Sequence, residues 1–227
     1  MSSSVAETNQ PIVQLTRQGT VFCGSSEGLE QLRSQFEGQH YFRLPQLIEP
    51  ALLHLIQLQI DSGQFYERVH EHIDSNKELC LQENAATGAL LFLVNDERLF
   101  ELIQQVTKCG RVRSFGGRIY RANPNNGHHD AWHNDMGENR LVGMTVNLSR
   151  TQYAGGNLQL RDCETRATIS EIPNTGAGDA VVFRLANNLQ HRISEVKGGA
   201  SKTAFAGWFR AQPDFSPLLM RSVPRSY

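Results

Sequence analysis

The first part of the chain has apolar residues at the three- and four-residue spacings of amphipathic helices. One such stripe covers residues 49–61, where Pro50 suits the first helical position. A second stripe covers residues 96–107 and begins with an aspartate suited to the N-cap. A shorter helix is expected around residues 28–36. The polar stretch 70–88 has no clear period, and its length favours a functional loop or lid.

From Arg111 onward, short apolar runs are separated by Gly, Asn and Pro, a pattern typical of strands in a sandwich or barrel. The expected strands are 111–121, 141–148, 157–161, 166–172, 179–184, 190–196 and 202–210. Because helices come first and strands follow, the pattern argues against a doubly wound parallel sheet. We expect one domain over residues 1–227: helical support (1–109) on one face of a double-sheet β core (110–210), then a tail (211–227).

Composition and charge exclude several classes of protein. The chain has 22 Lys and Arg against 23 Asp and Glu, so its net charge of −1 provides no global attraction to nucleic acid or anionic membranes. No apolar run reaches the roughly 18 residues of a membrane span. The N-terminal residues lack the features of a secretory signal. A cytoplasmic protein with reduced cysteines is therefore expected.

Candidate metal ligands lie in the segment DAWHNDMGEN. Alternate residues of an extended segment project to the same side, so His133 and Asp135 are expected to present a nitrogen and an oxygen to one point. His191, 56 residues after Asp135, is expected to come alongside on a distant strand. Two imidazoles and one carboxylate are the ligands of non-haem Fe(II) oxygenases. Zn²⁺ is the alternative metal, although the helical H-E-x-x-H of hydrolytic zinc enzymes is absent.

The last expected strand carries a lysine among small residues. Four residues share one face of this strand: Lys202, Ala204, Ala206 and Trp208. The two alanines leave empty volume beside the ammonium group, and a buried lysine requires an anion. Arg192 and Lys197 are the alternative cations for the same role.

The strand expected over residues 141–148 has one face of small and polar residues, namely Gly143, Thr145 and Asn147. Such a face either lines an active-site cavity or forms an outer solvated surface. Both interpretations stay open at the level of the sequence.

These residues belong to an ordered set of motifs that resembles the 2-oxoglutarate- and Fe(II)-dependent dioxygenases, specifically the prolyl-4-hydroxylase-like branch. The motifs, spread over about two-fifths of the chain, are His133-x-Asp135, Val146-Asn147-Leu148, Gly155-Gly156, Gly178-Asp179 with Phe183, His191, and Lys202 with Trp208. The resemblance implies a mostly β fold, the double-stranded β-helix or jelly roll, with N-terminal helical support. It also implies that His133, Asp135 and His191 are the catalytic iron ligands.

The resemblance further implies a 2-oxoglutarate site in which Lys202 binds the distal carboxylate, with Tyr120 and Asn147 as additional cofactor-binding residues. With Fe(II), 2-oxoglutarate and O₂, such an enzyme hydroxylates an unactivated C–H bond and decarboxylates 2-oxoglutarate to succinate. We expect a small-molecule or amino-acid-type substrate, free or carrier-tethered. The main alternative is a protein or peptidyl prolyl-type hydroxylase. A Zn-dependent hydrolase and a non-catalytic jelly-roll binding protein are more remote alternatives.

A stretch without acidic residues precedes the candidate ligands. Residues 102–129 contain no Asp or Glu but five cations: Lys108, Arg111, Arg113, Arg118 and Arg121. Such a stretch is commonly a solvated face. Alternatively, it attracts an acidic or carboxylate-bearing substrate, with Arg118 and Arg121 nearest the pocket mouth and His129 at the substrate edge.

Overall fold

The structure of the 227-residue chain is a computed structural model that describes residues 11–69, 77–124, 126, 131–137 and 139–213. The helices of these residues are α1 (Ser26–Gln39), α2 (Pro50–Asp61), α3 (Ala85–Val94) and α4 (Glu97–Thr107). The first strands are β1 (Val13–Thr16), β2 (Gly19–Phe22), β3 (Tyr41–Leu44), β4 (Phe65–Val69), β5 (Lys77–Leu81), β6 (Ser114–Ala122) and β7 (Arg140–Asn147). The remaining strands are β8 (Ala154–Gly155), β9 (Leu158–Asp162), β10 (Thr168–Ile172), β11 (Ala180–Arg184), β12 (Leu189–Ile193), β13 (Val196–Lys197) and β14 (Lys202–Arg210).

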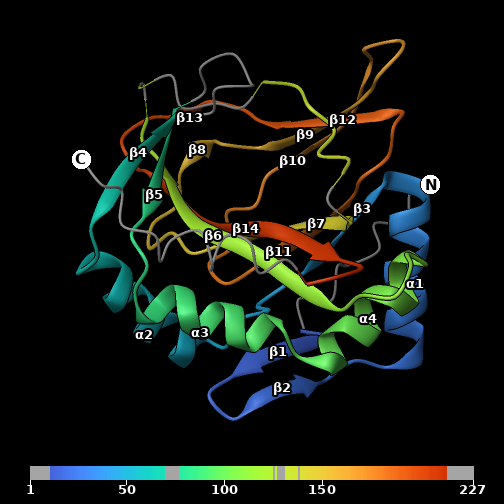
Figure 1. Ribbon diagram of the computed structural model, residues 1–227, viewed down its shortest axis with the longest axis horizontal. Helices are drawn as coiled ribbons and strands as arrows, with labels where there is room; N and C mark the ends of the chain where they lie inside the picture. The colour runs from blue at the N-terminus through green and yellow to red at the C-terminus, as the bar shows by residue number, and fades with distance from the viewer. Residues whose placement is uncertain (1–10, 70–76, 125, 127–130, 138, 214–227) are drawn as a thin grey trace, which may run out of the picture.

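Two antiparallel sheets face each other and form the β core (Figure 1). The major sheet has seven strands in the order β3-β11-β7-β14-β6-β5-β4, and the minor sheet has three in the order β10-β9-β12. Two short pairs, β1-β2 and β13-β8, complete the described sheets. The mostly β, double-sheet fold expected from the sequence is therefore confirmed.

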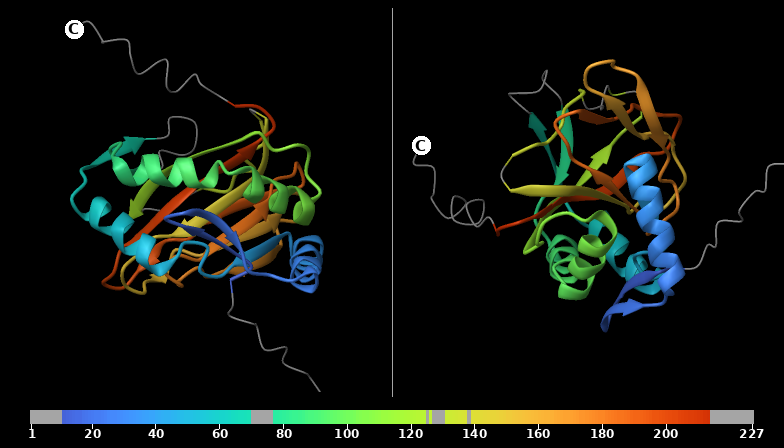
Figure 2. Two further views of the ribbon diagram at one scale, coloured as in Figure 1. Left: turned by 90° about the horizontal axis from the view of Figure 1, so that it is seen from below. Right: turned by 90° about the vertical axis from the view of Figure 1, so that its right-hand side faces the viewer.

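The helices lie on one side of the major sheet. Figures 1 and 2 show α2, α3 and α4 against the face of this sheet that is turned away from the minor sheet. The main apolar core lies between them, where side chains of β6 and β14 such as Ile119 and Phe205 are fully buried. Because the helices and this core cover one face of the major sheet, a binding site can form on the opposite face of the sheet. We call that opposite face, which is turned toward the minor sheet, the inner face.

Local sequence signals explain where the helices begin. α2 begins at Pro50, as expected, and the Asp96 carboxylate caps α4 by accepting a hydrogen bond from the backbone N–H of Arg98. The helix expected over residues 28–36 is longer, because Ser25 caps it one turn earlier. No helix among the described residues is long and apolar enough to cross a membrane.

The prediction of a loop over residues 70–88 is wrong for the part that forms β5 and the start of α3. Residues 70–76 lie outside the described residues. α3 was missed because its sequence, AATGALLFLV, is apolar almost throughout and shows no helical period. Its start is nevertheless capped by Asn84, whose side chain accepts hydrogen bonds from the N–H groups of Ala86 and Thr87. The early strands β1 to β4 were missed because each has only four or five residues.

Strand alternation decides which residues reach the inner face. Val181 and Phe183 of the major sheet pack there against Leu158 and Leu160 of the minor sheet. Since Thr145 lies opposite Val181 in the register of β7 and β11, it faces the same way and is 3% exposed. The solvated-face interpretation of this strand is therefore wrong, and its small polar residues line the interior between the sheets.

Replacing Gly143 by alanine is expected to destabilise the fold, because the added Cβ would lie 2.2 Å from Cζ of Phe183. Overpacking of this kind costs about 1–3 kcal/mol, and each kcal/mol lowers the melting temperature of a domain of this size by about 2–4 °C. Thermal unfolding measures the effect. Gly88→Ala is the control, since nothing lies within 4 Å of its added Cβ on α3. Equal melting temperatures for the two variants would contradict the packing.

Candidate metal centre

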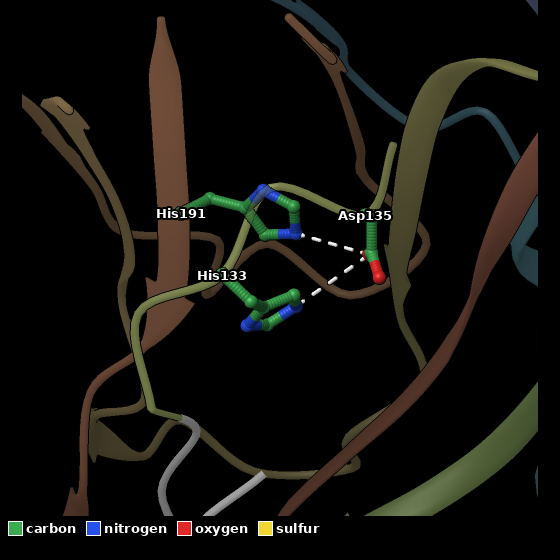
Figure 3. A group of neighbouring side chains, drawn as sticks. All are labelled: His133, Asp135 and His191. Carbon is green, nitrogen blue, oxygen red and sulfur yellow. Dashed lines mark hydrogen bonds and ion pairs between the residues drawn. The ribbon is translucent and has the colours of Figure 1, made fainter. Parts of the chain in front are cut away.

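His133, Asp135 and His191 converge on one point (Figure 3). One ligand atom from each residue lies within 4.8 Å of the others. Oδ2 of Asp135 lies 3.1 Å from Nε2 of His191 and 3.5 Å from Nε2 of His133. The three side chains that the sequence spacing singled out are thus brought together, and they are the only such metal-ligating group among the described residues.

The backbone holds the two histidines side by side. His133 donates its N–H to the carbonyl of His191 over 3.1 Å, and His191 donates to the carbonyl of His133 over 2.7 Å. The segment is not extended at Asp135, however, where φ is 53°. The carboxylate therefore reaches the site through a left-handed turn, not through the strand alternation that the sequence argument assumed.

Hydrogen bonding and packing orient the imidazole rings. Nδ1 of His133 lies 2.7 Å from the carbonyl oxygen of Ala131. Because a carbonyl only accepts, Nδ1 carries a proton, and Nε2 is the ring nitrogen that faces the site. The ring of His191 is buried, with its centroid 4.8 Å from that of Phe183. Both rings are therefore held in place to offer a nitrogen.

Both oxygens of the Asp135 carboxylate are bound. Nε1 of Trp208 donates to Oδ2 over 2.8 Å, and Nη1 of Arg140 donates to Oδ1 over 3.0 Å. Burial opposes ionisation of Asp135, but hydrogen bonds and charge from His133 and His191 outweigh it and hold the pKa of this carboxyl well below its usual value. An ionised carboxylate beside two imidazole nitrogens is the donor set that suits Fe(II).

Arg140 is a site residue that the sequence analysis missed. Besides binding Asp135, its guanidinium lies 3.9 Å from the centroid of the Trp208 ring. Arg140 opens β7, five residues after Asp135, whose backbone has a positive φ. No spacing or motif marks such a contact in the sequence.

Lys202 is buried on the inner face, 2% exposed, and its Nζ donates to the carbonyl of Gly156 over 2.6 Å. The alternative cations lie elsewhere. The Arg192 guanidinium stacks 4.5 Å from the centroid of the Trp132 ring, and Lys197 is exposed. Of the three cations, only Lys202 combines burial with a position on the inner face.

The two other residues assigned to cofactor binding also reach the inner face. Tyr120 and Asn147 lie opposite Ala204 on the two strands that flank β14. The side chain of Asn147 donates to the carbonyl of Gly176 and accepts from the N–H of Ser149, so it supports the strand end. A role for either residue in cofactor binding stays a prediction.

The structure separates the predicted substrate residues. Arg118 faces the inner side, with Nε 3.3 Å from Oε1 of Glu78. Arg121 lies on the helix-facing side, where it donates to Thr203 Oγ1 and stacks 4.2 Å from the centroid of the Phe65 ring. The structure therefore does not bring Arg121 to the site. His129 lies outside the described residues.

Comparison with known families agrees with this geometry. The family model described as "2OG-Fe(II) oxygenase superfamily" matches residues 117–210. Residues 117–210 form a 2OG-Fe(II) oxygenase domain. The matched segment runs from β6 to the end of β14 and includes all three candidate metal ligands. No curated protein matches the chain.

Solved structures share the fold of this chain over most of their length. A 2OG-Fe(II) oxygenase family oxidoreductase from Burkholderia pseudomallei superposes with a TM-score of 0.63 at 14% identity, covering 88% of this chain and 96% of the other. A Pseudomonas putida prolyl-4-hydroxylase gives 0.60 at 17% identity, covering 81% and 99%. A prolyl hydroxylase from Trichoplax adhaerens, in complex with a hypoxia inducible factor peptide, gives 0.57 at 13% identity, covering 88% and 98%.

The expected resemblance to prolyl-4-hydroxylase-like oxygenases and the jelly-roll fold are thereby confirmed. Residues 117–210 thus match a superfamily of oxidoreductases that use Fe(II), 2-oxoglutarate and O₂. The donor set of the His133, Asp135 and His191 cluster fits this metal.

Proposed function

We propose that this oxygenase hydroxylates an unactivated C–H bond of a small-molecule or amino-acid-type substrate and couples this reaction to decarboxylation of 2-oxoglutarate to succinate. His133, Asp135 and His191 are the iron ligands in this proposal. The observation that carries it is their convergence beside the inner face that holds the buried Lys202. When bound, Fe(II) with 2-oxoglutarate and O₂ supplies the oxidising chemistry.

The protein contributes orientation at the metal. Trp208 and Arg140 each hold one oxygen of Asp135, which keeps the carboxylate fixed relative to the two imidazoles. These three side chains would hold the metal and would leave coordination positions for the co-substrates. The presence of a carboxylate at this ligand position favours hydroxylation, since halogenating relatives replace it with a small residue.

The protein also contributes a binding site for the co-substrate. In the proposal, the Lys202 ammonium group binds the distal carboxylate of 2-oxoglutarate, and the small side chains of Ala204 and Ala206 leave room along the inner face. Tyr120, opposite Ala204 on β6, is a further cofactor-binding residue in this proposal.

The test is to incubate the Fe(II)-loaded enzyme with 2-oxoglutarate and O₂ and to measure succinate and CO₂. Candidate substrates include free amino acids, small carboxylic acids and proline-containing peptides. The peptides are included because two structural neighbours are prolyl hydroxylases, so a peptidyl substrate is the second candidate. Iron-dependent succinate formation that rises with a hydroxylated substrate supports the proposal. Turnover that needs Zn²⁺ and consumes no keto acid refutes it.

Charge at the edge of the inner face predicts a carboxylate on the substrate. Two guanidinium groups flank the Glu78 carboxylate there, Arg68 Nη1 at 3.7 Å and Arg118 Nε at 3.3 Å from its Oε1, so these three side chains together carry one positive charge. Arg118→Glu is therefore expected to raise KM for the substrate by about 10-fold or more, the effect of losing a charge-assisted hydrogen bond. Steady-state kinetics measure the change. Arg113→Glu, an exposed arginine before the same strand, is the matched control. Equal KM values for both variants would remove this idea.

A further inference from the structure

Thr145 presents a buried hydroxyl group to the interior between the sheets. The residue is 3% exposed, and within the described part of the chain its Oγ1 has no hydrogen-bond partner. Its cross-strand neighbours on the inner face are Val181 and Ala206, whose side chains can neither donate nor accept. A buried hydroxyl without a partner lowers stability, so its presence here points to a ligand that satisfies it.

Thr145 lies between the two ends of the proposed co-substrate site. On β14, its neighbour Ala206 stands four residues from Lys202 and two from Trp208. Trp208 in turn donates a hydrogen bond to Asp135 at the metal centre. The hydroxyl is therefore flanked by the cation at one end and the metal-ligating carboxylate at the other.

We infer that Thr145 is a further binding residue for 2-oxoglutarate, and that its hydroxyl donates a hydrogen bond to an oxygen of the bound keto acid. The inference rests on the proposed function. The residue opposite Thr145 on β14 is Ala206, whose side chain has no polar atom. The strand that carries Lys202 therefore supplies no hydroxyl group at this position. Thr145 provides the only side-chain hydroxyl in its cross-strand row, which consists of Arg43, Val181, Thr145, Ala206 and Arg118.

Two variants separate the hydroxyl from the shape of the side chain. Thr145→Val keeps the volume and removes the hydroxyl, whereas Thr145→Ser keeps the hydroxyl and removes a methyl group. The affinity for 2-oxoglutarate is measured by anaerobic calorimetry on the Mn(II)-loaded enzyme, so the readout is independent of turnover. Thermal unfolding of the metal-free, ligand-free protein is measured in parallel.

Thr145→Val is expected to weaken 2-oxoglutarate binding by about 10-fold or more, the effect of losing a hydrogen bond to a charged group. Thr145→Ser should bind close to the wild-type affinity. The melting temperature of ligand-free Thr145→Val should be equal to or higher than that of the wild type, because an unsatisfied buried group has been removed.

Wild-type affinity in Thr145→Val overturns the inference and leaves the proposed function standing. A lower melting temperature in ligand-free Thr145→Val also overturns it, since the hydroxyl would then be structural. If the wild-type enzyme itself fails to bind 2-oxoglutarate, the inference and the proposed function fall together.

Discussion

Replacing His133 by alanine is expected to abolish iron-dependent turnover of 2-oxoglutarate. Loss of a residue that merely supports a metal ligand costs about 10–100-fold in metal affinity, so loss of the ligand itself should cost more than about 100-fold. The fold should survive, because the side chain of His133 is partly exposed and Asp135 keeps its contacts with Trp208 and Arg140. Iron content after anaerobic loading and the rate of succinate formation measure the effect.

A second histidine provides the control for this variant. His54 is exposed on α2, outside the metal centre, and His54→Ala should retain iron and activity. Turnover that persists in His133→Ala and still depends on Fe(II) would contradict the assignment of this ligand.

Replacing Lys202 by methionine is expected to weaken 2-oxoglutarate binding by about 100-fold or more. Removing one partner of a buried charge pair costs about 3–5 kcal/mol, and each 1.4 kcal/mol corresponds to about tenfold in affinity. Methionine keeps the length and the apolar contacts of the lysine stem. Iron binding should be unchanged, because none of the three candidate ligands is substituted and the ammonium group of Lys202 donates to the carbonyl of Gly156, 5.9 Å from the centroid of the Tyr153 ring. Anaerobic titration of the iron-loaded enzyme with 2-oxoglutarate measures the affinity.

The neighbouring Lys197 supplies the matched control, since it is exposed on β13 and Lys197→Met should bind 2-oxoglutarate like the wild type. If Lys202→Met also keeps wild-type affinity, another cation binds the co-substrate. A simultaneous loss of iron in Lys202→Met would instead mean that the substitution had disturbed the metal centre.

The β core could be predicted from the sequence because its strands carry their own signal. Alternation over residues 141–148 and 202–210 placed β7 and β14 within a residue of their observed bounds. The same alternation placed Lys202, Ala204 and Ala206 on one face of β14 and the helix-facing residues on the other. The short strands that precede β6 have too few residues for such a pattern.

The contacts that the sequence did not predict depend on backbone turns and on strand parity. The hydrogen bond between Arg140 and Asp135 accompanies a left-handed backbone conformation at Asp135, which no sequence pattern predicted. The separation of Arg118 from Arg121 has a simpler reason. Residues three apart on one strand project to opposite faces, so only one of the two arginines can reach the inner face.

The proposed iron and 2-oxoglutarate site is tested most directly by the visible spectrum of the wild-type enzyme, loaded anaerobically with Fe(II) and titrated with 2-oxoglutarate. A keto acid that chelates iron gives a weak visible absorption band. The site formed by His133, Asp135 and His191 predicts one iron per chain and a band that appears on addition of 2-oxoglutarate and is absent in His133→Ala. Absence of the band in the wild type, or an equal band in His133→Ala, would contradict the proposed site.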